Sequence, residues 1–316
     1  MDDVKTDPAR KGLALSRDFY RNVLGPALNA RFPALAARTA VGLVGNGSEC
    51  FGYDDALSRD HDWGASVYLW LCDGDTGSAD ALDRLQQALL QAHPAYPPRV
   101  QSRYGAAVGA VGTHDFYLRL TGFPEGPQTL QEWRLVPEEL LALATNGEVF
   151  SDPVGCFTAI RTHLLQDLPE DLRLRRILSS CMSLAQTGQY NLPRYLSRGL
   201  AAEEQLLAAR FAQETVHLTF LLNRRYMPYY KWSMRALSDL PLLGGEVRAR
   251  LGAFLLLSPG GARLPAAEAL CRLFAETLRR EGLSTDKSDF LADHGPQIAR
   301  RIQDPTLRAL PLQATL

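Results

Sequence analysis

The densest group of residues capable of chemistry lies between Gly47 and Asp62. Gly47 and Ser48 follow a short apolar run over 39–44, and Asp60 and Asp62 precede a second apolar run. Backbone N–H groups in such a turn, together with the serine hydroxyl, can hold phosphate oxygens. Two carboxylates can hold magnesium, with waters and substrate phosphates as the remaining ligands. We therefore expect this combination to perform nucleotidyl transfer.

An expected strand over 62–71 governs how the two aspartates are placed. Alternate strand residues point the same way, so Asp60 and Asp62 share a face if the strand begins by Asp60, about 7 Å apart along the backbone. His61 then points to the opposite face, and we expect a structural role for it. Each half of the motif alone is usually an ordinary turn or a solvated strand end. Their order, and the apolar run attached to each, carry the prediction.

The first half of the chain alternates short apolar runs with glycine and proline. Its patterns predict helices at 9–29, 78–92 and 136–145, and strands at 39–44, 62–71, 105–112 and 147–151. We therefore expect an α/β (α+β) domain with a mixed sheet over residues 1–152.

Helical patterns dominate the second half of the chain. They predict helices at 154–166, 169–187, 193–223, 228–240, 244–257, 265–281 and 288–303. Gly188 fits a helix stop, and Pro193 fits the first turn of the next helix. We therefore expect an all-α helical bundle over residues 153–316.

Composition excludes several classes of protein. The formal net charge of −1, from 34 basic and 35 acidic residues, argues against a dedicated nucleic-acid or anionic-membrane protein. The 5 cysteines are scattered and show no metal-ligand spacing, so a reducing compartment is the simpler interpretation. With no signal core at the start and no run that could span a bilayer, we expect a cytoplasmic location.

The central motif resembles the signature of the polymerase β-type nucleotidyltransferase superfamily, in which a hydrophobic strand, Gly-Ser, a spacer and Asp-x-Asp follow one another. The fuller string resembles a narrower bacterial family of uncharacterised minimal nucleotidyltransferases with a helical C-terminal domain of unknown function. The residues of that string are Gly47-Ser48-Glu49, Gly52-Tyr53-Asp54 and Ser58-Arg59-Asp60-His61-Asp62-Trp63-Gly64. Two later stretches, within 188–199 and 221–232, are also similar to that family.

This resemblance implies a nucleotidyltransferase-like fold, with a mixed sheet flanked by helices, and a donor that is ATP or another nucleoside triphosphate. It implies that Gly47 and Ser48 contact phosphates and that Asp60 and Asp62 bind Mg²⁺. It also implies a helical domain that helps to form the acceptor pocket. The acceptor could be a small molecule or a protein, and the overall charge makes nucleic acid the less attractive choice.

A third carboxylate is the missing part of the superfamily pattern. The segment that should carry it, 105–112, contains no acid. Asp115 follows that segment but resembles part of a helix N-cap. Glu214 falls within the apolar stripe of its helix, where burial would suit it to general-base work or to a structural hydrogen bond. Without a third acid, the alternative is a catalytically weak or inactive nucleotide-binding regulatory module.

Several residues of the helical half are further candidates. Lys231 lies in an aromatic stretch and could contact the triphosphate, or the stretch could be a packed helix junction. Arg194 and Arg198 share a helix face and could receive phosphates, although solvated arginines are the usual outcome. Arg210 and His217 resemble the Arg…His motif of helical ribonuclease domains. A helical-domain ribonuclease or toxin–antitoxin component is therefore a second alternative.

Overall fold

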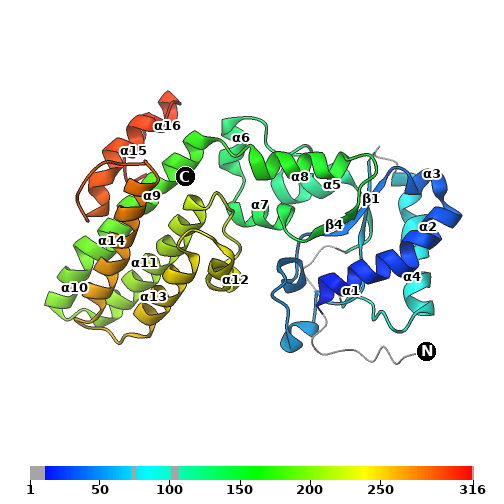
Figure 1. The fold of residues 1–316 in the computed structure, drawn as a ribbon, viewed down its shortest axis with the longest axis horizontal. Helices are drawn as coiled ribbons and strands as arrows, with labels where there is room; N and C mark the ends of the chain where they lie inside the picture. The colour runs from blue at the N-terminus through cyan, green and yellow to red at the C-terminus, as the bar shows by residue number, and fades with distance from the viewer. Residues whose placement is uncertain (1–10, 73–75, 101–106, 315–316) are drawn as a thin grey trace. The chain divides into compact units, whose positions relative to one another are not determined.

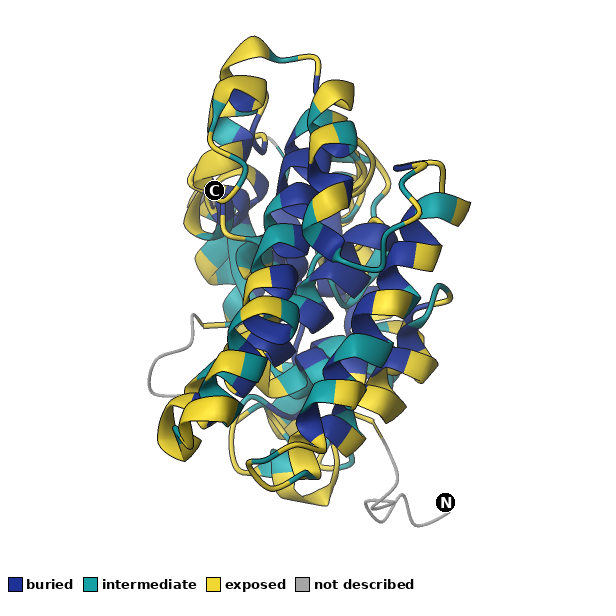
Figure 2. Cartoon of the chain, turned by 90° about the vertical axis from the view of Figure 1, so that its left-hand side faces the viewer, coloured by how far each residue is buried: buried dark blue, intermediate teal, exposed yellow. Residues whose placement is uncertain are grey.

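The computed structural model of the chain describes residues 11–72, 76–100 and 107–314. The chain divides into two compact units, Met1–Asp167 and Leu168–Leu316 (Figure 1). In the second unit, which faces the viewer in Figure 2, the buried residues concentrate on the inner faces of the helices. The expected boundary after residue 152 falls one helix earlier than this division, because the helix that follows packs within the first unit.

A mixed four-stranded sheet organises the first unit. Its strands are β1 (Thr39–Leu43), β2 (Tyr68–Leu71), β3 (Ala110–Gly112) and β4 (Glu148–Ser151). They lie in the order β3-β2-β1-β4. β1 pairs antiparallel with β2 and β4, and β2 pairs parallel with β3. The mixed sheet expected from the sequence is thus present.

Helices surround this sheet. They are α1 (Gly12–Phe19), α2 (Gly25–Arg31), α3 (Pro33–Ala36), α4 (Ala79–Ala92), α5 (Thr113–Thr121), α6 (Leu130–Leu135), α7 (Glu138–Thr145) and α8 (Cys156–Gln166). A π-helical turn over Tyr20–Leu24 joins α1 to α2, so the helix expected over 9–29 is continuous across the described residues.

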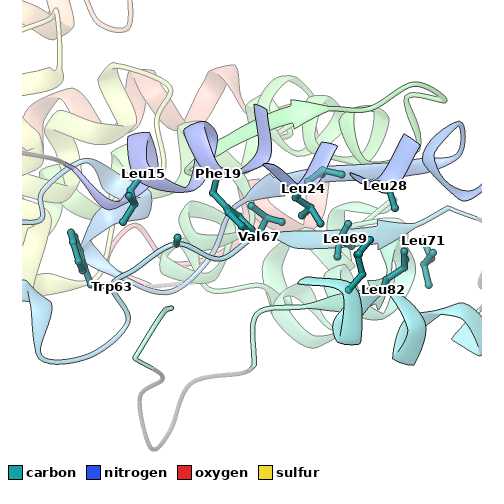
Figure 3. Packing of buried hydrophobic residues seen from close by; sticks show 12 residues of the cluster. Leu15, Phe19, Leu24, Leu28, Trp63, Val67, Leu69, Leu71 and Leu82 are labelled. Carbon is teal, nitrogen blue, oxygen red and sulfur yellow. The ribbon is translucent and has the colours of Figure 1, made fainter. Parts of the chain in front are cut away.

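Strand β2 is buried along its whole length because helices cover both of its faces. Leu69 and Leu71 belong to an apolar cluster with residues of the α1–α2 segment and α4 (Figure 3). On the other face, the Trp70 ring stacks on Phe157 of α8, with ring centroids 3.7 Å apart, and meets Phe116 of α5 edge-on. This double burial explains a strand that is apolar at every position.

Strand β2 is shorter than the sequence indicated, because it begins at Tyr68 and not near Asp60. Among the described residues, the preceding segment pairs at two isolated positions, Trp63 with Val100 and Ala65 with Pro98. Pro97 and Pro98 lack the N–H groups that a continuous ladder needs, which limits the pairing. The expected alternation of Asp60 and Asp62 on one strand face is therefore wrong, since neither residue lies in a strand. The strand expected over 105–112 is β3, and residues 105–106 lie outside the described residues.

The second unit is helical. Its helices are α9 (Glu170–Leu184), α10 (Leu192–Arg198), α11 (Ala201–Leu222), α12 (Tyr230–Ala236), α13 (Gly244–Leu256), α14 (Arg263–Arg280), α15 (Gly295–Arg301) and α16 (Pro305–Ala309). The helix expected over 193–223 is two helices, because Gly199 adopts a left-handed conformation with φ 66° between them. Among the described residues, none of the helices combines the length and apolarity needed to cross a bilayer.

Gly188 does not end a helix, contrary to the sequence-based prediction. It lies inside a π-helical turn, Ala185–Asn191, that continues α9 into α10. A Cβ atom at this position would lie 2.4 Å from Cε2 of Phe211, so glycine is required by packing and not by a left-handed turn. Pro193 does occupy the first turn of α10, as predicted.

A disulfide joins Cys72 and Cys156, whose Cα atoms lie 5.8 Å apart. Cys72 directly follows β2, and Cys156 is the first residue of α8. Their separation of 84 residues gave no pairing signal in the sequence. The other cysteines, Cys50, Cys181 and Cys271, are free and buried.

We predict that Phe157→Ala destabilises the first unit by about 3–5 kcal/mol, because it removes the ring that stacks on Trp70 and leaves a cavity. Urea unfolding followed by circular dichroism measures the change. Leu135→Ala, at a residue that is 74% exposed in α6, is the matched control and should change the stability by less than about 0.5 kcal/mol. Equal effects of the two substitutions would show that the ring stack is not a centre of the core.

Candidate functional site

The turn after β1 has the backbone that close approach of a ligand requires. Gly45 and Gly47 have φ values of 112° and 109°, which residues with a side chain rarely adopt. Ser48 opens a short 3₁₀ turn, Ser48–Phe51. The Asn146 side chain fixes the turn, because its Oδ1 accepts from the Gly45 N–H at 2.7 Å and its Nδ2 donates to the Gly45 carbonyl at 2.9 Å.

Asp62 lies against this turn. A Cβ atom on Gly47 would lie 3.0 Å from the Asp62 carbonyl oxygen and 3.5 Å from the Asp62 Cβ. The antiparallel pairing explains the contact, since β1 ends and β2 begins at the same end of the sheet. Asp62 itself has φ 50°, an uncommon conformation for a residue with a side chain. Gly47 and Asp62, predicted to act together, are therefore neighbours.

Asp60 lies on the bend before Asp62, and its side chain is 67% exposed. One carboxylate oxygen accepts from the backbone N–H of His61, and the other lies 3.0 Å from the His61 Nδ1. The side-chain hydrogen bond from His61 lowers the pKa of the Asp60 carboxyl. Asp60 is thus held by its neighbour in the chain, whereas Asp62, whose side chain is 15% exposed, lies against the turn.

Arg99 is a site residue that the sequence analysis missed. Its Nη2 donates to the Asn46 carbonyl at 2.9 Å and lies 3.8 Å from the Asp62 Oδ1. Its Nη1 forms an ion pair with Glu49, which is fully buried. Burial lowers the pKa of Arg99 to about 10, so its guanidinium stays charged at neutral pH. A single arginine after two prolines carries no motif, which is why only the fold identifies it.

Two acids of the central motif have structural roles. Glu49 pairs with Arg99, and Asp54 is buried, with its carboxylate accepting from the Gly12 N–H at 2.8 Å and from the Trp63 Nε1–H at 3.0 Å. These contacts hold the start of α1 and the loop between β1 and β2 together. Asp55 is exposed and caps the 3₁₀ turn Ala56–Arg59 of the same loop, and the other loop acids with solvent access are Asp60 and Asp62.

Asp115 is placed away from the turn. β3 runs parallel to β2, and Gly112, its last residue, pairs with Leu71 at the end of β2. Asp115 follows in the first turn of α5, at the end of the sheet where β2 ends. Asp62 lies at the opposite end, where β2 begins. The fold therefore does not bring Asp115 together with Gly47 and Asp62.

Among the described residues, one group of three His, Cys, Asp or Glu residues has ligand atoms within 4.8 Å of one another. That group is Cys72, Asp152 and Cys156, and it does not include Asp60 or Asp62. In the described part of the chain, Asp60 and Asp62 therefore do not form so compact a group with a third His, Cys, Asp or Glu.

Glu214, the other candidate for the third acid, belongs to a polar cluster of the second unit. Its carboxylate accepts from the Ser180 Oγ–H at 3.0 Å and lies 3.4 Å from the Arg210 Nε. The Nδ1 of His217 lies 4.0 Å from the same carboxylate. Arg210 and His217, the two residues of the ribonuclease-like spacing, thus both lie next to Glu214.

Lys231 lines a groove of about 730 Å³ in the second unit, together with Arg235, Ser238 and Arg248. Its Nζ also lies 4.9 Å from the centroid of the Trp232 ring. Arg194 stacks on the Tyr190 ring at 3.4 Å and donates to the Tyr190 carbonyl. The groove is rich in cations and suits an anionic ligand.

We predict that Arg99→Met lowers the stability of the protein by about 3–5 kcal/mol, because it leaves the buried Glu49 carboxylate without its cation. Adding Glu49→Gln to this variant should recover at least about 2 kcal/mol, since the buried charge is then removed as well. Arg84→Met, at an exposed position of α4, is the control. Chemical unfolding measures all three, and a double variant no more stable than Arg99→Met would contradict the ion-pair assignment.

Comparison with known proteins identifies one partial match. A family described as a domain of unknown function, DUF4037, matches residues 133–233. The matched segment runs from α6 to the start of α12 and contains Glu214 and Lys231, but not the Gly47–Asp62 loop. No curated protein and no solved structure gives a significant match to this chain.

Proposed function

We propose that this protein is a magnesium-dependent nucleotidyltransferase that moves a nucleoside monophosphate, AMP from ATP as the most probable case, to a hydroxyl of an acceptor and releases pyrophosphate. The observation that carries the proposal is the contact between the Gly47 turn and Asp62 at the end of the sheet where β1 ends and β2 begins. The resemblance of residues 47–64 to the polymerase β-type signature supports the same activity.

The residues of the turn are suited to a triphosphate. Gly45 and Gly47 carry no Cβ and have positive φ values, so a phosphate can come close to the backbone of the turn. In this proposal Ser48 adds its hydroxyl. The Arg99 guanidinium lies next to Asn46 and Asp62 and holds the turn in place, while its charge is matched by that of the buried Glu49.

In this proposal Asp62 and Asp60 hold a magnesium ion whose other ligands are water and substrate. Magnesium in such sites takes one or two carboxylates and leaves its other positions to waters and phosphates. Asp62 has solvent access beside the turn, and Asp60 is exposed two residues earlier. When bound, the ion would neutralise charge that develops on the phosphates during transfer.

Activation of the acceptor hydroxyl falls, in this proposal, to the carboxylates of the loop. Asp115 lies at the opposite end of the sheet, and the Glu214 carboxylate contacts Ser180 and Arg210. Asp60 and Asp62 would therefore act through the magnesium ion that they hold, which would make the acceptor hydroxyl easier to deprotonate.

We assign recognition of the acceptor to the helical unit, where Lys231 and Arg248 line a groove. Cations at a groove favour an acceptor that carries negative charge, on a small molecule or on a protein. A cytoplasmic location, where ATP and magnesium are available, is part of the same proposal.

The double variant Asp60→Ala with Asp62→Ala tests the proposal. With labelled ATP and magnesium, we expect the wild type to transfer label to an acceptor in a cell extract. The double variant should transfer at least about 100-fold less, because the charge-stabilising ion is lost. Asp80→Asn, at an exposed position of α4, is the matched control and should keep the wild-type rate. Equal label transfer by the double variant and the wild type would refute the assignment.

A nucleotide-binding module without turnover is the second candidate, and it is favoured because, among the described residues, Asp60 and Asp62 form no such compact group with a third acid. Titration calorimetry with a non-hydrolysable ATP analogue separates the two candidates when combined with the transfer assay. Binding that requires magnesium and weakens at least about 10-fold in Asp62→Asn is expected in both cases. Such binding without label transfer to any acceptor fraction identifies the module, and the absence of binding rules out both candidates.

A further inference from the structure

The end of the sheet opposite to the Gly47 turn carries a second group of reactive side chains. Strands β2, β3 and β4 all end at this end of the sheet. Leu71, the last residue of β2, pairs with Thr39 and with Gly112, and β4 runs antiparallel to β1. Cys72 directly follows β2, Thr113 follows β3, and Asp152 follows β4. Cys156, at the start of α8, completes the group.

The two cysteines meet in a geometry that suits a disulfide. Their Cα atoms lie 5.8 Å apart, within the usual range for bonded cysteines, and the sulfur atoms are bonded. The Thr113 Oγ1 lies 3.6 Å from the Cys156 sulfur. Both cysteines are partly exposed, so small thiols and disulfides can reach them.

Asp152 has a task of its own next to this pair. One carboxylate oxygen accepts from the Gly155 N–H at 2.9 Å, and the other accepts from the Thr158 N–H at 2.8 Å. Both oxygens thus bond N–H groups at the start of α8. These bonds favour a disulfide between Cys72 and Cys156 over a metal ion held by all three residues, although the ligand types alone would allow a thiophilic metal.

We propose that Cys72 and Cys156 form a reversible thiol–disulfide redox site that exchanges with low-molecular-weight disulfides and thiols. We assign the attack to Cys156, the first residue of an 11-residue helix. The helix N-terminus favours a thiolate there and the nearby Asp152 carboxylate opposes one, so the single variants below decide between Cys156 and Cys72. This inference does not depend on nucleotidyl transfer.

The exchange has two balanced steps. The Cys156 thiolate attacks one sulfur of a low-molecular-weight disulfide, forms a mixed disulfide and releases one small thiolate. The Cys72 thiolate then attacks the Cys156 sulfur and displaces the second small thiolate. The two protein thiols lose two electrons, the small disulfide gains them, and the two protons end on the small thiols. An excess of the small thiol reverses both steps.

The remaining cysteines supply an internal control. Cys50, Cys181 and Cys271 are buried, and burial raises the pKa of Cys181 to about 12 and also raises the pKa values of the other two thiols. Thiols held in the neutral form exchange slowly. They should therefore stay unmodified in the folded protein while Cys72 and Cys156 react.

A redox titration of the full chain tests the proposal. The protein is equilibrated at a series of ratios of reduced to oxidised glutathione, quenched with acid and alkylated, and each cysteine is assigned by peptide mass spectrometry. We expect the Cys72–Cys156 disulfide to form and disappear with the ratio. We also expect the oxidised protein to melt at least about 5 °C above the reduced protein, because the cross-link restricts the unfolded chain.

Single variants identify the attacking thiol. Cys72→Ser should accumulate a glutathione adduct on Cys156 about 10-fold faster than Cys156→Ser accumulates one on Cys72. If a variant does not fold, the wild-type titration still decides the main claim. A pair that stays reduced at every ratio, or a disulfide that excess thiol never reduces, overturns the proposal. Stoichiometric Zn²⁺ binding that blocks alkylation and is lost in Asp152→Ala would overturn it in favour of a metal site.

Discussion

The antiparallel pairing of β1 with β2 is the constraint on which the candidate site depends. It brings the end of β1 and the segment before β2 to the same end of the sheet. Gly47 and Asp62 are therefore in contact although a long loop separates them in the chain. The pairing in turn requires β2 to stay buried, with leucines on one face and the Trp70 ring stack on the other. The position of the polar candidate site at the end of the sheet thus depends on the burial of the apolar strand β2.

Buried charge then shapes the loop that the pairing creates. Glu49 and Arg99 form an ion pair inside the loop, and Asp54 ties it to α1 and Trp63. A buried ion pair seldom adds much net stability, but each partner makes the other indispensable. The central motif therefore divides into acids that hold the loop and acids that face solvent, and only the latter are available for chemistry.

Much of this arrangement could be predicted from residue patterns. The periodicity of 78–92 and the apolar run of 39–44 predicted α4 and β1 well, since each element is long or strongly patterned. The strand at Asp62 was wrong because two prolines on the neighbouring segment interrupt its ladder, and the stop at Gly188 was wrong because packing against Phe211 selects glycine there. Arg99 and the Cys72–Cys156 pair depend on contacts between distant segments, which periodicity does not encode.

Trp63 gives the loop a built-in optical reporter. Its indole N–H bonds the Asp54 carboxylate, and the Arg59 guanidinium lies 4.4 Å from the centroid of its ring. A negative charge at one end of the indole and a positive charge over its face set the local electric field, to which indole emission is sensitive. Occupation of the neighbouring turn by an anion would alter that field, so the contribution of Trp63 to the emission of the chain's 4 tryptophans would change with the state of the loop.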